Sequence, residues 1–387
     1  MITLLSIAMV VALLSAAFVV LRWPTYECMG DTPLPTLSFL AILFTSGLDV
    51  GLIMFPLIDF ETYATGVDYS FASPLVIEFG FWGGLVWGFY FLTTLYFCAI
   101  EPRLKLFELA PIRWVHNLVV IATCAFTAYL FLAYLPSYIE GIGALATYLL
   151  VGSVIVLAVV SSTKLAVLRV LSLSSTGLFF VLIAFAWVVS GVGIGGLFNE
   201  ISGLSDYLAN LDRFVLPIND YHGFYLSWWF AWSIMIGQFV ARFVNGMAAW
   251  KLFIAILIVP SIPIALWFSV LYGYFASGIP VSDSITLLMI VVGVFFVINS
   301  LDSLTRLYSQ NLGLTVEALG RPRYVVTHAG LLGSLVVLYQ FTPLKIEWIG
   351  MIVIGLYVAI YGLIFMRRND LMGDAPDTAK TPNTPRT

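Results

Sequence analysis

Apolar runs long enough to cross a lipid bilayer recur along nearly the whole chain of 387 residues. A hydrocarbon core about 30 Å thick is crossed by about 20 apolar residues in a helix. Hydrophobic residues make up 61% of the chain and charged residues 10%, whereas charged residues make up about 25% of soluble domains. The sequence therefore predicts an all-α polytopic membrane protein in a lipid bilayer.

Eleven such runs are separated by polar connectors or connectors that contain Pro or Gly, and each is predicted to be a transmembrane helix. They cover residues 1–22, 37–58, 75–98, 115–137, 142–163, 174–198, 222–245, 251–274, 284–306, 325–342 and 346–366. The first run is too long for a signal peptide, lacks a basic start, and has no cleavage site of small residues before Arg22, so we expect a retained helix.

The basic residues of the connectors fall mainly on one side of the predicted membrane. Those on this side are Arg22, Arg103, Lys105, Arg113, Lys164, Arg169, Arg242, Lys251, Arg306, Arg321, Arg323, Arg367, Arg368, Lys380 and Arg386. Of the 17 basic residues, only Arg213 and Lys345 fall on the other side. The positive-inside rule then predicts a cytoplasmic (inner) membrane protein with its N-terminus outside and its C-terminus in the cytoplasm.

Charge and cysteine content exclude several other classes of protein. A net charge of -4 provides no basic patch for nucleic acid. The cysteines and histidines are too far apart for the usual zinc, haem or iron–sulfur spacings: they are Cys28, Cys98, Cys124, His116, His222 and His328. A membrane enzyme would need a nucleophile and base, or a metal set, at one depth, and none is visible, so we expect neither an enzyme nor a cofactor.

The connector 199–221 places Ile201, Leu204, Leu208 and Leu211 at helical spacing. This pattern is typical of an amphipathic helix that lies on the outer membrane interface. A loop helix that packs on the protein without a partner role is the alternative.

The second predicted span carries Thr45-Ser46-Gly47-Leu48-Asp49-Val50-Gly51 at its centre. Two glycines and a carboxylate predict that the helix is interrupted there. An ionised Asp at a helix centre costs about 2.5–3.5 kcal/mol, so Asp49 should face a cavity and pair with a cation or carry a proton. Irregular backbone at this depth is tolerated where it lines a cavity, as in transporter sites. A buried structural hydrogen bond is the alternative role for Asp49.

Two spans are rich in aromatic residues. Residues 81–90 read Phe-Trp-Gly-Gly-Leu-Val-Trp-Gly-Phe-Tyr, and residues 225–232 read Tyr-Leu-Ser-Trp-Trp-Phe-Ala-Trp. Such residues often form interfacial belts or simply pack. However, Trp87 lies deep in its span, and convergent aromatic faces bind a desolvated quaternary ammonium with about 2 kcal/mol or more per favourable contact.

Four segments in order carry a resemblance to a known family. Residues 226–242 resemble the signature W-A-W-W-I-x-W-x-P-F-V-G-x-F-x-A-R of the betaine/choline/carnitine transporter family. Residues 44–55 are similar to its F-x-A-G-M-G-I-G-L-M-F, residues 298–303 to its T-S-A-D-S, and Trp82, Trp87 and Tyr90 have the spacing of its aromatic-box helix. The outer segment 203–208 also resembles the one that precedes the signature. The resemblance is clearest up to Asp302.

The resemblance implies a leucine-transporter-like core of ten helices in two inverted five-helix repeats, which would occupy residues 37–198 and 222–366. Residues 1–36 would be a peripheral helix and loop, 199–221 the outer amphipathic helix, and 367–387 a disordered cytoplasmic tail rich in Pro and Thr. Family members usually carry two extra N-terminal helices, and this chain resembles a shortened member that lacks the first. The resemblance also implies a homotrimer.

Carried over by position, the family's substrate site falls on two sets of residues. The aromatic box and the glycine-rich segment beside it would be Trp82, Trp87, Tyr90, Trp228, Trp229, Trp232, Gly47, Asp49 and Gly51. The sodium positions would be the backbone of Thr45 and Leu48, the side chains of Asn299 and Ser300, and, for a second site, Thr123 and Thr127.

The departures from the family pattern bear on the substrate. Asp49 replaces a glycine, Asn299 replaces a threonine, and Ile234-Met235 replaces Pro-Phe. A carboxylate beside the box would repel betaine and attract choline or another cationic amine. We therefore expect a symporter of small quaternary-ammonium or methylated-amine solutes, coupled to sodium or protons.

Two alternatives remain open: a transporter-like scaffold or sensor without transport, and a carrier of another small amine or amino acid. Glu78 and Asp302 are assigned no role, because both are placed near span ends.

Overall fold

The computed structural model describes residues 1–48 and 50–372 and is 82% helical. Among the described residues, nine helical segments are long and apolar enough to cross a membrane. They are Ile2–Arg22, Pro74–Ala99, Ala110–Ser137, Ala144–Ser161, Leu165–Ser190, Ala249–Ser277, Asp283–Leu312, Arg321–Phe341 and Ile346–Met366. The prediction of an all-α polytopic membrane protein is therefore confirmed.

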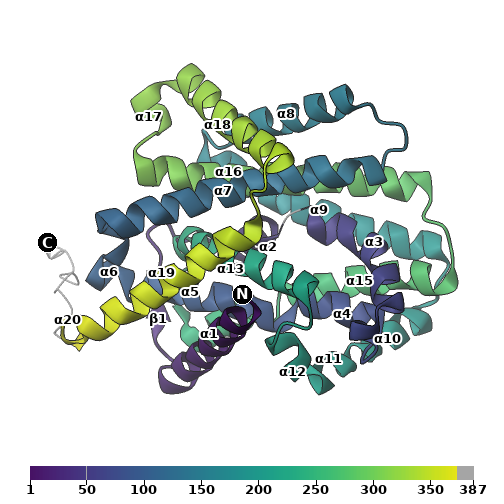
Figure 1. Cartoon of the computed structure of the whole chain (residues 1–387), viewed down its shortest axis with the longest axis horizontal. Coiled ribbons are helices and arrows are strands. Elements are labelled where there is room, and N and C mark those ends of the chain that lie inside the picture. Colours follow the sequence, from purple (N-terminus) through teal and green to yellow (C-terminus); the bar gives the residue numbers. More distant parts are fainter. Residues whose placement is uncertain (49, 373–387) are drawn as a thin grey trace, which may run out of the picture.

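The other two predicted spans have special features. One is the pair α2 (Thr36–Gly47) and α3 (Gly51–Thr65), which are bent by 50° from each other and together make a tenth span. The other is α13 (Asp220–Ala241), which is less apolar than the nine segments because it carries Asp, His, Ser and Tyr. It lies at the centre of the bundle (Figure 1) and is buried over almost all of its length. This helix is therefore surrounded by protein rather than by lipid.

The predicted span 174–198 was misplaced along the chain. Helix α9 covers Leu165–Ser190, so it begins earlier and ends earlier than expected. The basic residues at its start were interpreted as connector, but Arg169 lies within the helix and its Nε donates to Ser38 Oγ over 3.1 Å. The helix ends where Gly191 adopts a left-handed conformation with φ 68°, which glycine adopts at low cost.

Three spans are interrupted, and only the first interruption was predicted. Besides the α2–α3 break, the third span consists of α4 (Pro74–Trp82), a 3₁₀ turn η2 (Gly84–Val86) and α5 (Trp87–Ala99). The eighth span consists of α14 (Ala249–Leu257) and α15 (Ser261–Ser277). The last two breaks meet, because the backbone N–H of Gly84 donates to Ser261 Oγ over 2.9 Å.

These two interrupted spans are the second helices of the two predicted repeats. Repeats of similar structure would place equivalent breaks at equivalent positions. The breaks are therefore compatible with the two-repeat division, which stays a prediction.

The remaining spans surround this centre (Figure 1). They are α1 (Ile2–Arg22), α7 (Ala110–Tyr134, continued by the turn η4, Leu135–Ser137), α8 (Ala144–Ser161), α16 (Asp283–Leu312), α18 (Arg321–Phe341) and α19 (Ile346–Met366). The most apolar stretch of Pro74–Ala99 is 83% buried, against 22% for α1. The aromatic-rich third span is thus central and α1 is peripheral.

Short elements close the ends of the bundle. They are η1 (Val67–Tyr69), α6 (Glu101–Leu104), η3 (Leu106–Glu108), α17 (Val316–Leu319) and α20 (Arg368–Met372). Strand β1 (Glu27–Cys28) pairs antiparallel with β2 (Met247–Ala248) and joins the connector after α1 to the loop after α13. The tail predicted as disordered from residue 367 is helical over Arg368–Met372, and residues 373–387 lie outside the described residues.

The connector predicted as one amphipathic helix folds into three short helices. These are α10 (Ile194–Gly203), α11 (Ser205–Ala209) and α12 (Leu211–Val215). Tyr207 and Phe214 are buried against α4, whereas Leu208 is 67% exposed. The aromatic rings attach this connector to the protein together with Leu204 and Leu211, which are partly buried against the core. Its place at the outer membrane interface stays a prediction.

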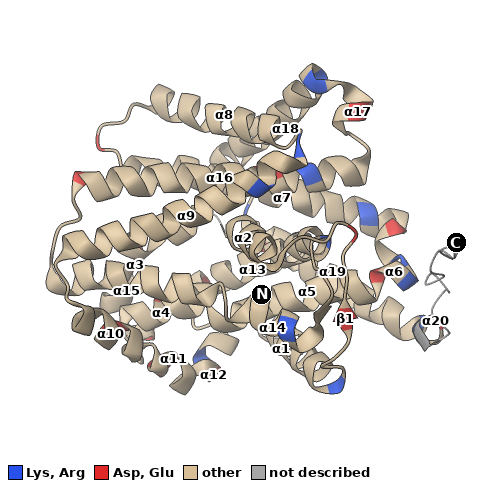
Figure 2. Cartoon of the chain, turned by 180° about the vertical axis from the view of Figure 1, so that it is seen from behind, with Lys and Arg blue, Asp and Glu red and all other residues tan. Residues whose placement is uncertain are grey.

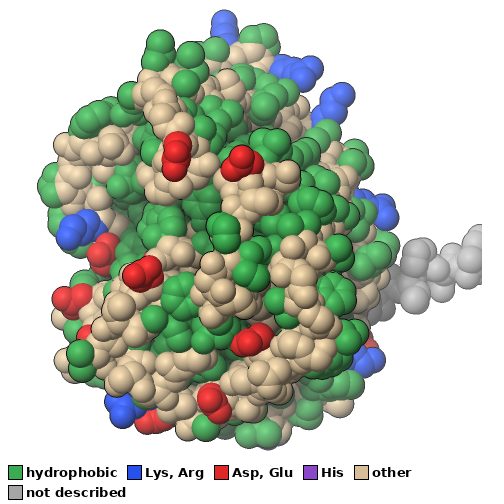
Figure 3. Space-filling view, turned by 90° about the vertical axis from the view of Figure 1, so that its right-hand side faces the viewer, with side chains coloured by type: hydrophobic (Ala, Val, Ile, Leu, Met, Phe, Trp, Pro, Cys, Tyr) green, Lys and Arg blue, Asp and Glu red, His purple; other side chains and the backbone are tan. Residues whose placement is uncertain are grey.

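Charges differ between the two ends of the molecule. Lys and Arg gather at the end where α6, α17 and α20 lie, while α12, which carries Arg213, lies toward the opposite end (Figure 2). The face of that opposite end shows Asp and Glu side chains among apolar and neutral ones, with basic side chains mainly at its edge (Figure 3). The charge partition predicted along the sequence is thus also a partition in space.

Candidate functional site

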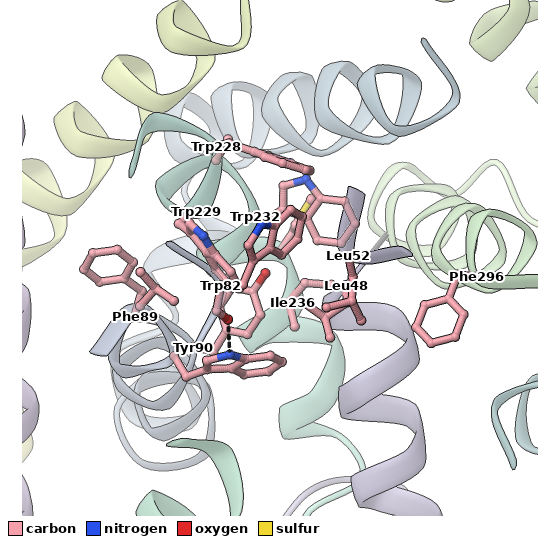
Figure 4. Packing of buried hydrophobic residues seen from close by; sticks show 14 of the residues in the cluster. Leu48, Leu52, Trp82, Phe89, Tyr90, Trp228, Trp229, Trp232, Ile236 and Phe296 are labelled. Atoms are coloured by element: carbon pink, nitrogen blue, oxygen red, sulfur yellow. Dashed lines mark hydrogen bonds between the residues drawn. The ribbon is translucent and has the colours of Figure 1, made fainter. Parts of the chain in front are cut away.

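Aromatic side chains from two distant parts of the chain converge at the centre of the bundle. The Trp229 ring of α13 lies 5.7 Å from that of Trp87 and 5.3 Å from that of Tyr90, both on α5. Trp82 of α4 lies 6.2 Å from Trp229 and 5.3 Å from Trp228 between ring centroids. Figure 4 shows this cluster with Leu48 beside it. The four residues of the predicted box are therefore neighbours.

The interruption of the third span is held by two of these tryptophans. The carbonyl groups at the end of a helix have no intrahelical donor. Here Trp229 Nε1 donates to the Phe81 carbonyl over 2.7 Å, and Trp87 Nε1 donates to the Trp82 carbonyl over 2.9 Å. Both indole N–H groups are thus used by the backbone, and what these rings offer to a ligand is their π faces.

The end of α2 lies directly against the box. Tyr90 Oη donates to the Gly47 carbonyl over 3.0 Å. A Cβ at Gly47 would lie 3.0 Å from Tyr90 Cε2, which is closer than most contacts of a Cβ atom. It would lie 3.5 Å from the Trp87 ring, at an ordinary contact distance. Glycine at this position therefore lets the interrupted helix approach the aromatic rings.

A small cavity lies between the rings. Its volume for water-sized molecules is about 10 Å³, and it is lined by Gly47, Leu48, Trp82, Tyr90, Trp228, Trp229 and Trp232. That is room for roughly one water molecule. The cavity therefore has to widen before a trimethylammonium group fits between the rings.

Three of the oxygen atoms predicted as sodium ligands are close together. Ser300 Oγ lies 2.8 Å from the Leu48 carbonyl and 3.4 Å from the Thr45 carbonyl. The two carbonyls lie at the C-terminal end of α2, where the carbonyls of a helix have no intrahelical donor, and all three residues are buried. Oxygen atoms of this kind suit a hard cation.

The fourth predicted ligand, Asn299, faces a different neighbour. Its Oδ1 accepts a hydrogen bond from Ser172 Oγ of α9 over 3.1 Å, and its Nδ2 is buried without a partner among the described residues. The carboxamide offers an oxygen only if it releases Ser172, so Asn299 is not equivalent to the threonine it replaces.

The residues of the second predicted sodium site lie on α7. Thr123 and Thr127 are fully buried one turn apart, and Thr127 Oγ1 donates to the Thr123 carbonyl over 3.5 Å. Thr123 Oγ1 is buried without a partner among the described residues. Among the described residues, neither threonine forms a hydrogen bond with a residue of the aromatic box.

Two glycine-segment residues remain. Gly51 begins α3 and is buried. Asp49 lies outside the described residues, so its predicted role stays a prediction.

Comparison with known proteins gives several partial matches. No family model matches the chain. An uncharacterized transporter of Mycobacterium tuberculosis (strain ATCC 25618 / H37Rv) is 25% identical over 138 residues, which cover 27% of this chain and 23% of that protein. A glycine betaine/proline/choline transporter of Vibrio parahaemolyticus is 25% identical over 100 residues, or 24% of this chain and 18% of that protein. A glycine betaine transporter of Bacillus subtilis (strain 168) is 40% identical over 53 residues, or 14% of this chain and 10% of that protein.

In the segments that they cover, these matches make the chain similar to betaine/choline transporters. The matched part spans less than a quarter of the length of the first of these relatives. The identity is low, but it agrees with the family resemblance of the sequence motifs.

A buried acidic cluster beside the box was missed by sequence reasoning. Asp59 of α3 and Glu78 of α4 are 6% and 0% exposed. Asp59 had been placed in a connector, because the second span was predicted to end at residue 58, whereas α3 continues to Thr65. Glu78 had been placed near a span end and given no role. Two acids close to long apolar runs are the signal that could have revealed the cluster.

Asp302, also left without a role, belongs to a network at the basic end of the bundle. Its Oδ1 accepts from Arg306 Nη2 over 2.9 Å, and its Oδ2 accepts from Ser161 Oγ of α8. Arg306 Nη2 also donates to the Lys164 carbonyl over 3.3 Å. This carboxylate has a cationic partner and ties α16 to the end of α8.

Two polar cavities of about 270 Å³ each lie at the same end, near α6. Both are lined by Glu101, Glu108 and Gln238. Burial raises the pKa of Glu101, although Tyr96 donates to its Oε2 over 2.7 Å. His116 bonds Gln238 Oε1 over 2.8 Å, a structural contact of the kind expected for a histidine near a span end.

Proposed function

We propose that this chain is a secondary active transporter of small quaternary-ammonium or methylated-amine solutes, coupled to sodium or protons. The observation that carries the proposal is a cavity at the interruption of α2–α3 that is lined by the rings of Trp82, Tyr90 and Trp229, with the Trp87 ring packed behind them against Tyr90 and Trp229. Because two of the indole N–H groups donate to backbone carbonyls, this surface offers π faces, which attract a methylated cation.

Binding at this site would require movement of whole helices. A cavity of about 10 Å³ is too small for a trimethylammonium group, and its walls belong to α2, to the α4–α5 span and to α13. Relative movement of α13 and the other two would open the site to one side of the membrane at a time. This is the alternating access that a midplane site between two repeats supports.

The coupling ion would be held next to the substrate. The carbonyls of Thr45 and Leu48 and the hydroxyl of Ser300 would hold a sodium ion, and Asn299 would join them only after releasing Ser172. Thr45 and Leu48 lie within two residues of Gly47, which lines the cavity. Ion binding would therefore order the segment that the substrate contacts.

The proposed orientation places the end with α6, α17 and α20 in the cytoplasm. The gathering of basic side chains at that end (Figure 2) supports this orientation under the positive-inside rule. The site of Trp82 and Trp229 would then open outward at the end with α10–α12. The protein would lie in the cytoplasmic membrane with its N-terminus outside.

A binding screen tests the substrate class. We expect choline, glycine betaine, carnitine or another methylated amine to raise the thermal stability of the purified protein, by about 2.7 kcal/mol at a concentration of 100 Kd. The screen is run with and without sodium and at two pH values. Stabilisation by unmethylated amino acids alone would favour the alternative of an amino acid carrier.

Uptake into proteoliposomes then separates a transporter from a scaffold or sensor. Gradient-driven accumulation of the ligand found in the screen is the expected result. A protein that binds the ligand but accumulates none of it under sodium or proton gradients would be a sensor, and the transport proposal would be wrong.

A further inference from the structure

The acidic pair Asp59 and Glu78 is joined by tyrosine hydroxyls from two elements. Tyr221 Oη and Tyr225 Oη of α13 donate to Asp59 Oδ2 over 2.8 Å and 3.2 Å. Tyr63 Oη of α3 lies 2.7 Å from Glu78 Oε2 and 3.4 Å from Asp59 Oδ2. The Tyr63 hydroxyl thus lies between the two carboxyl groups, closer to Glu78.

The three tyrosine hydroxyls supply fewer hydrogen atoms than two carboxylates can accept, and the Trp82 indole is the other neutral donor that acts on Glu78. A tyrosine hydroxyl has a single hydrogen, so Tyr63 serves Glu78, its nearer acceptor, and not both acids. Glu78 is fully buried, and its Oε1 forms no hydrogen bond with the described residues. A buried carboxylate that lacks donors is strongly disfavoured, and protonation lowers this cost because it removes the buried charge.

No positive side chain faces the pair. Among the described residues, no Lys, Arg or His forms an ion pair with Asp59 or Glu78. Apart from the two acids themselves, the titratable groups around the pair are phenols of α3, η1 and α13 and the phenol that follows η4: Tyr63, Tyr69, Tyr221, Tyr225 and Tyr138. The nearby His222 accepts a hydrogen bond at Nδ1 from the Ile218 N–H, so its ring is neutral. Two ionised acids here would have no compensating charge.

The buried position selects the smallest cation. With Glu78 fully buried and Asp59 6% exposed, there is no surface on which a methylated amine could approach both oxygens. We propose that Asp59 and Glu78 form a shared proton-binding site. One carboxylate takes a proton from a hydronium ion and becomes a carboxylic acid, and a water molecule leaves; release of the proton reverses the step.

This proposal rests on the proposed transport function, for which it names the proton as a coupling cation. Helix α13 carries both the hydroxyls that reach Asp59 and Trp229 of the box, and the Tyr225 ring lies 5.6 Å from the Trp82 ring of α4. If α13 moves away from α3 and α4 to open the site, it takes Tyr221 and Tyr225 from Asp59 and lets water reach the pair. Proton exchange and access to the box are thereby linked.

Infrared spectroscopy of the full chain in lipid tests the site without transport. We expect a carbonyl band of a buried protonated carboxyl group, sensitive to exchange into heavy water, that is lost in Glu78→Gln or Asp59→Asn and shifted in Tyr63→Phe. Glu61→Gln, on the exposed side of the same helix, is the matched control and should leave the band unchanged. A band that persists in both acid variants, or that disappears only in Asp49→Asn, would overturn the proposal.

A second measurement links the site to the ligand. For one linked proton, the Kd for choline should change by up to about tenfold per pH unit, and this dependence should vanish in the double variant Asp59→Asn/Glu78→Gln. An unchanged pH dependence in a folded double variant contradicts the coupling. If no methylated amine binds even the wild type, the proposed function fails, while the infrared result still decides the proton site.

Discussion

At the scale of single residues, the tryptophans of the site have two separate tasks. Trp87 and Trp229 each use the indole N–H to satisfy a carbonyl at the broken end of α4, and each turns part of its ring toward the cavity or its neighbours. The side chains that make the break tolerable are therefore the ones that would bind the ligand. Loss of either ring would therefore also leave a carbonyl of α4 without its donor.

The first prediction concerns these rings. Trp87→Leu or Trp229→Leu keeps apolar bulk but removes the π face, so the affinity for a quaternary ammonium should fall by about tenfold or more. Trp348→Leu, at a ring that is 51% exposed on α19, is the control and should bind normally. Calorimetric titration with choline measures the effect, and normal binding in both box variants would remove the aromatic box from the mechanism.

A second prediction concerns Asp49, which the sequence places between Leu48 and Val50. If its carboxylate pairs with a cationic substrate, Asp49→Asn should weaken choline binding at every pH and spare or improve a zwitterion. If it pairs with a coupling ion, the variant should bind substrate but lose ion-driven accumulation. Binding and uptake measured side by side separate the two, and wild-type behaviour in both would make Asp49 a structural residue.

At the scale of elements, small residues set how closely the central helix packs. A Cβ at Gly237 of α13 would lie 2.1 Å from Thr93 Oγ1 of α5, and one at Gly350 of α19 would lie 2.4 Å from the Ser227 carbonyl of α13. Neither distance is compatible with real atoms. Helix α13 is therefore held between α5 and α19 at backbone distance, which positions Trp229 against Trp87 and Tyr90.

The third prediction follows from this packing. Gly237→Ala or Gly350→Ala should lower the free energy of unfolding by about 1–3 kcal/mol, because the helices have to move apart. Gly177→Ala on α9 has no heavy atom within 4 Å of the new Cβ and should stay within about 0.5 kcal/mol of wild type. Thermal unfolding in detergent gives the comparison. Equal melting of all three variants would mean that α13 tolerates a wider spacing.

At the scale of the whole molecule, the separation of charge predicts the orientation in the membrane. The fourth prediction is that Thr3→Cys and Leu208→Cys, in a background in which Cys28, Cys98 and Cys124 are replaced, react with an impermeant thiol reagent added outside intact cells. Asp374→Cys and Glu317→Cys should react only after the membrane is opened. The reverse labelling would invert every statement above about the outer and cytoplasmic ends.

The implied homotrimer also stays a prediction, testable by the mass of the protein in a lipid disc.

Much of the organisation was predictable because the thickness of the bilayer sets the length of the apolar run that each transmembrane helix needs. The spans, the interruption between Gly47 and Gly51, and the two aromatic motifs all follow from local sequence. Local sequence did not predict the break at Gly83, because two glycines within an apolar run are also compatible with a continuous helix. Only the fold shows that the freed carbonyls are satisfied by indoles, one of them from α13.

The acidic pair shows most clearly what the tertiary structure alone decided. Asp59 and Glu78 each resemble an ordinary charge near the end of a span, and nothing in their spacing says that they share a hydroxyl. They meet because α3 and α4 pack together and because Tyr221 and Tyr225 come from a helix more than 140 residues away. Sequence determined which segments enter the membrane, because entry depends on the hydrophobicity of each segment by itself. Which polar groups meet inside depended on packing between segments distant in the chain.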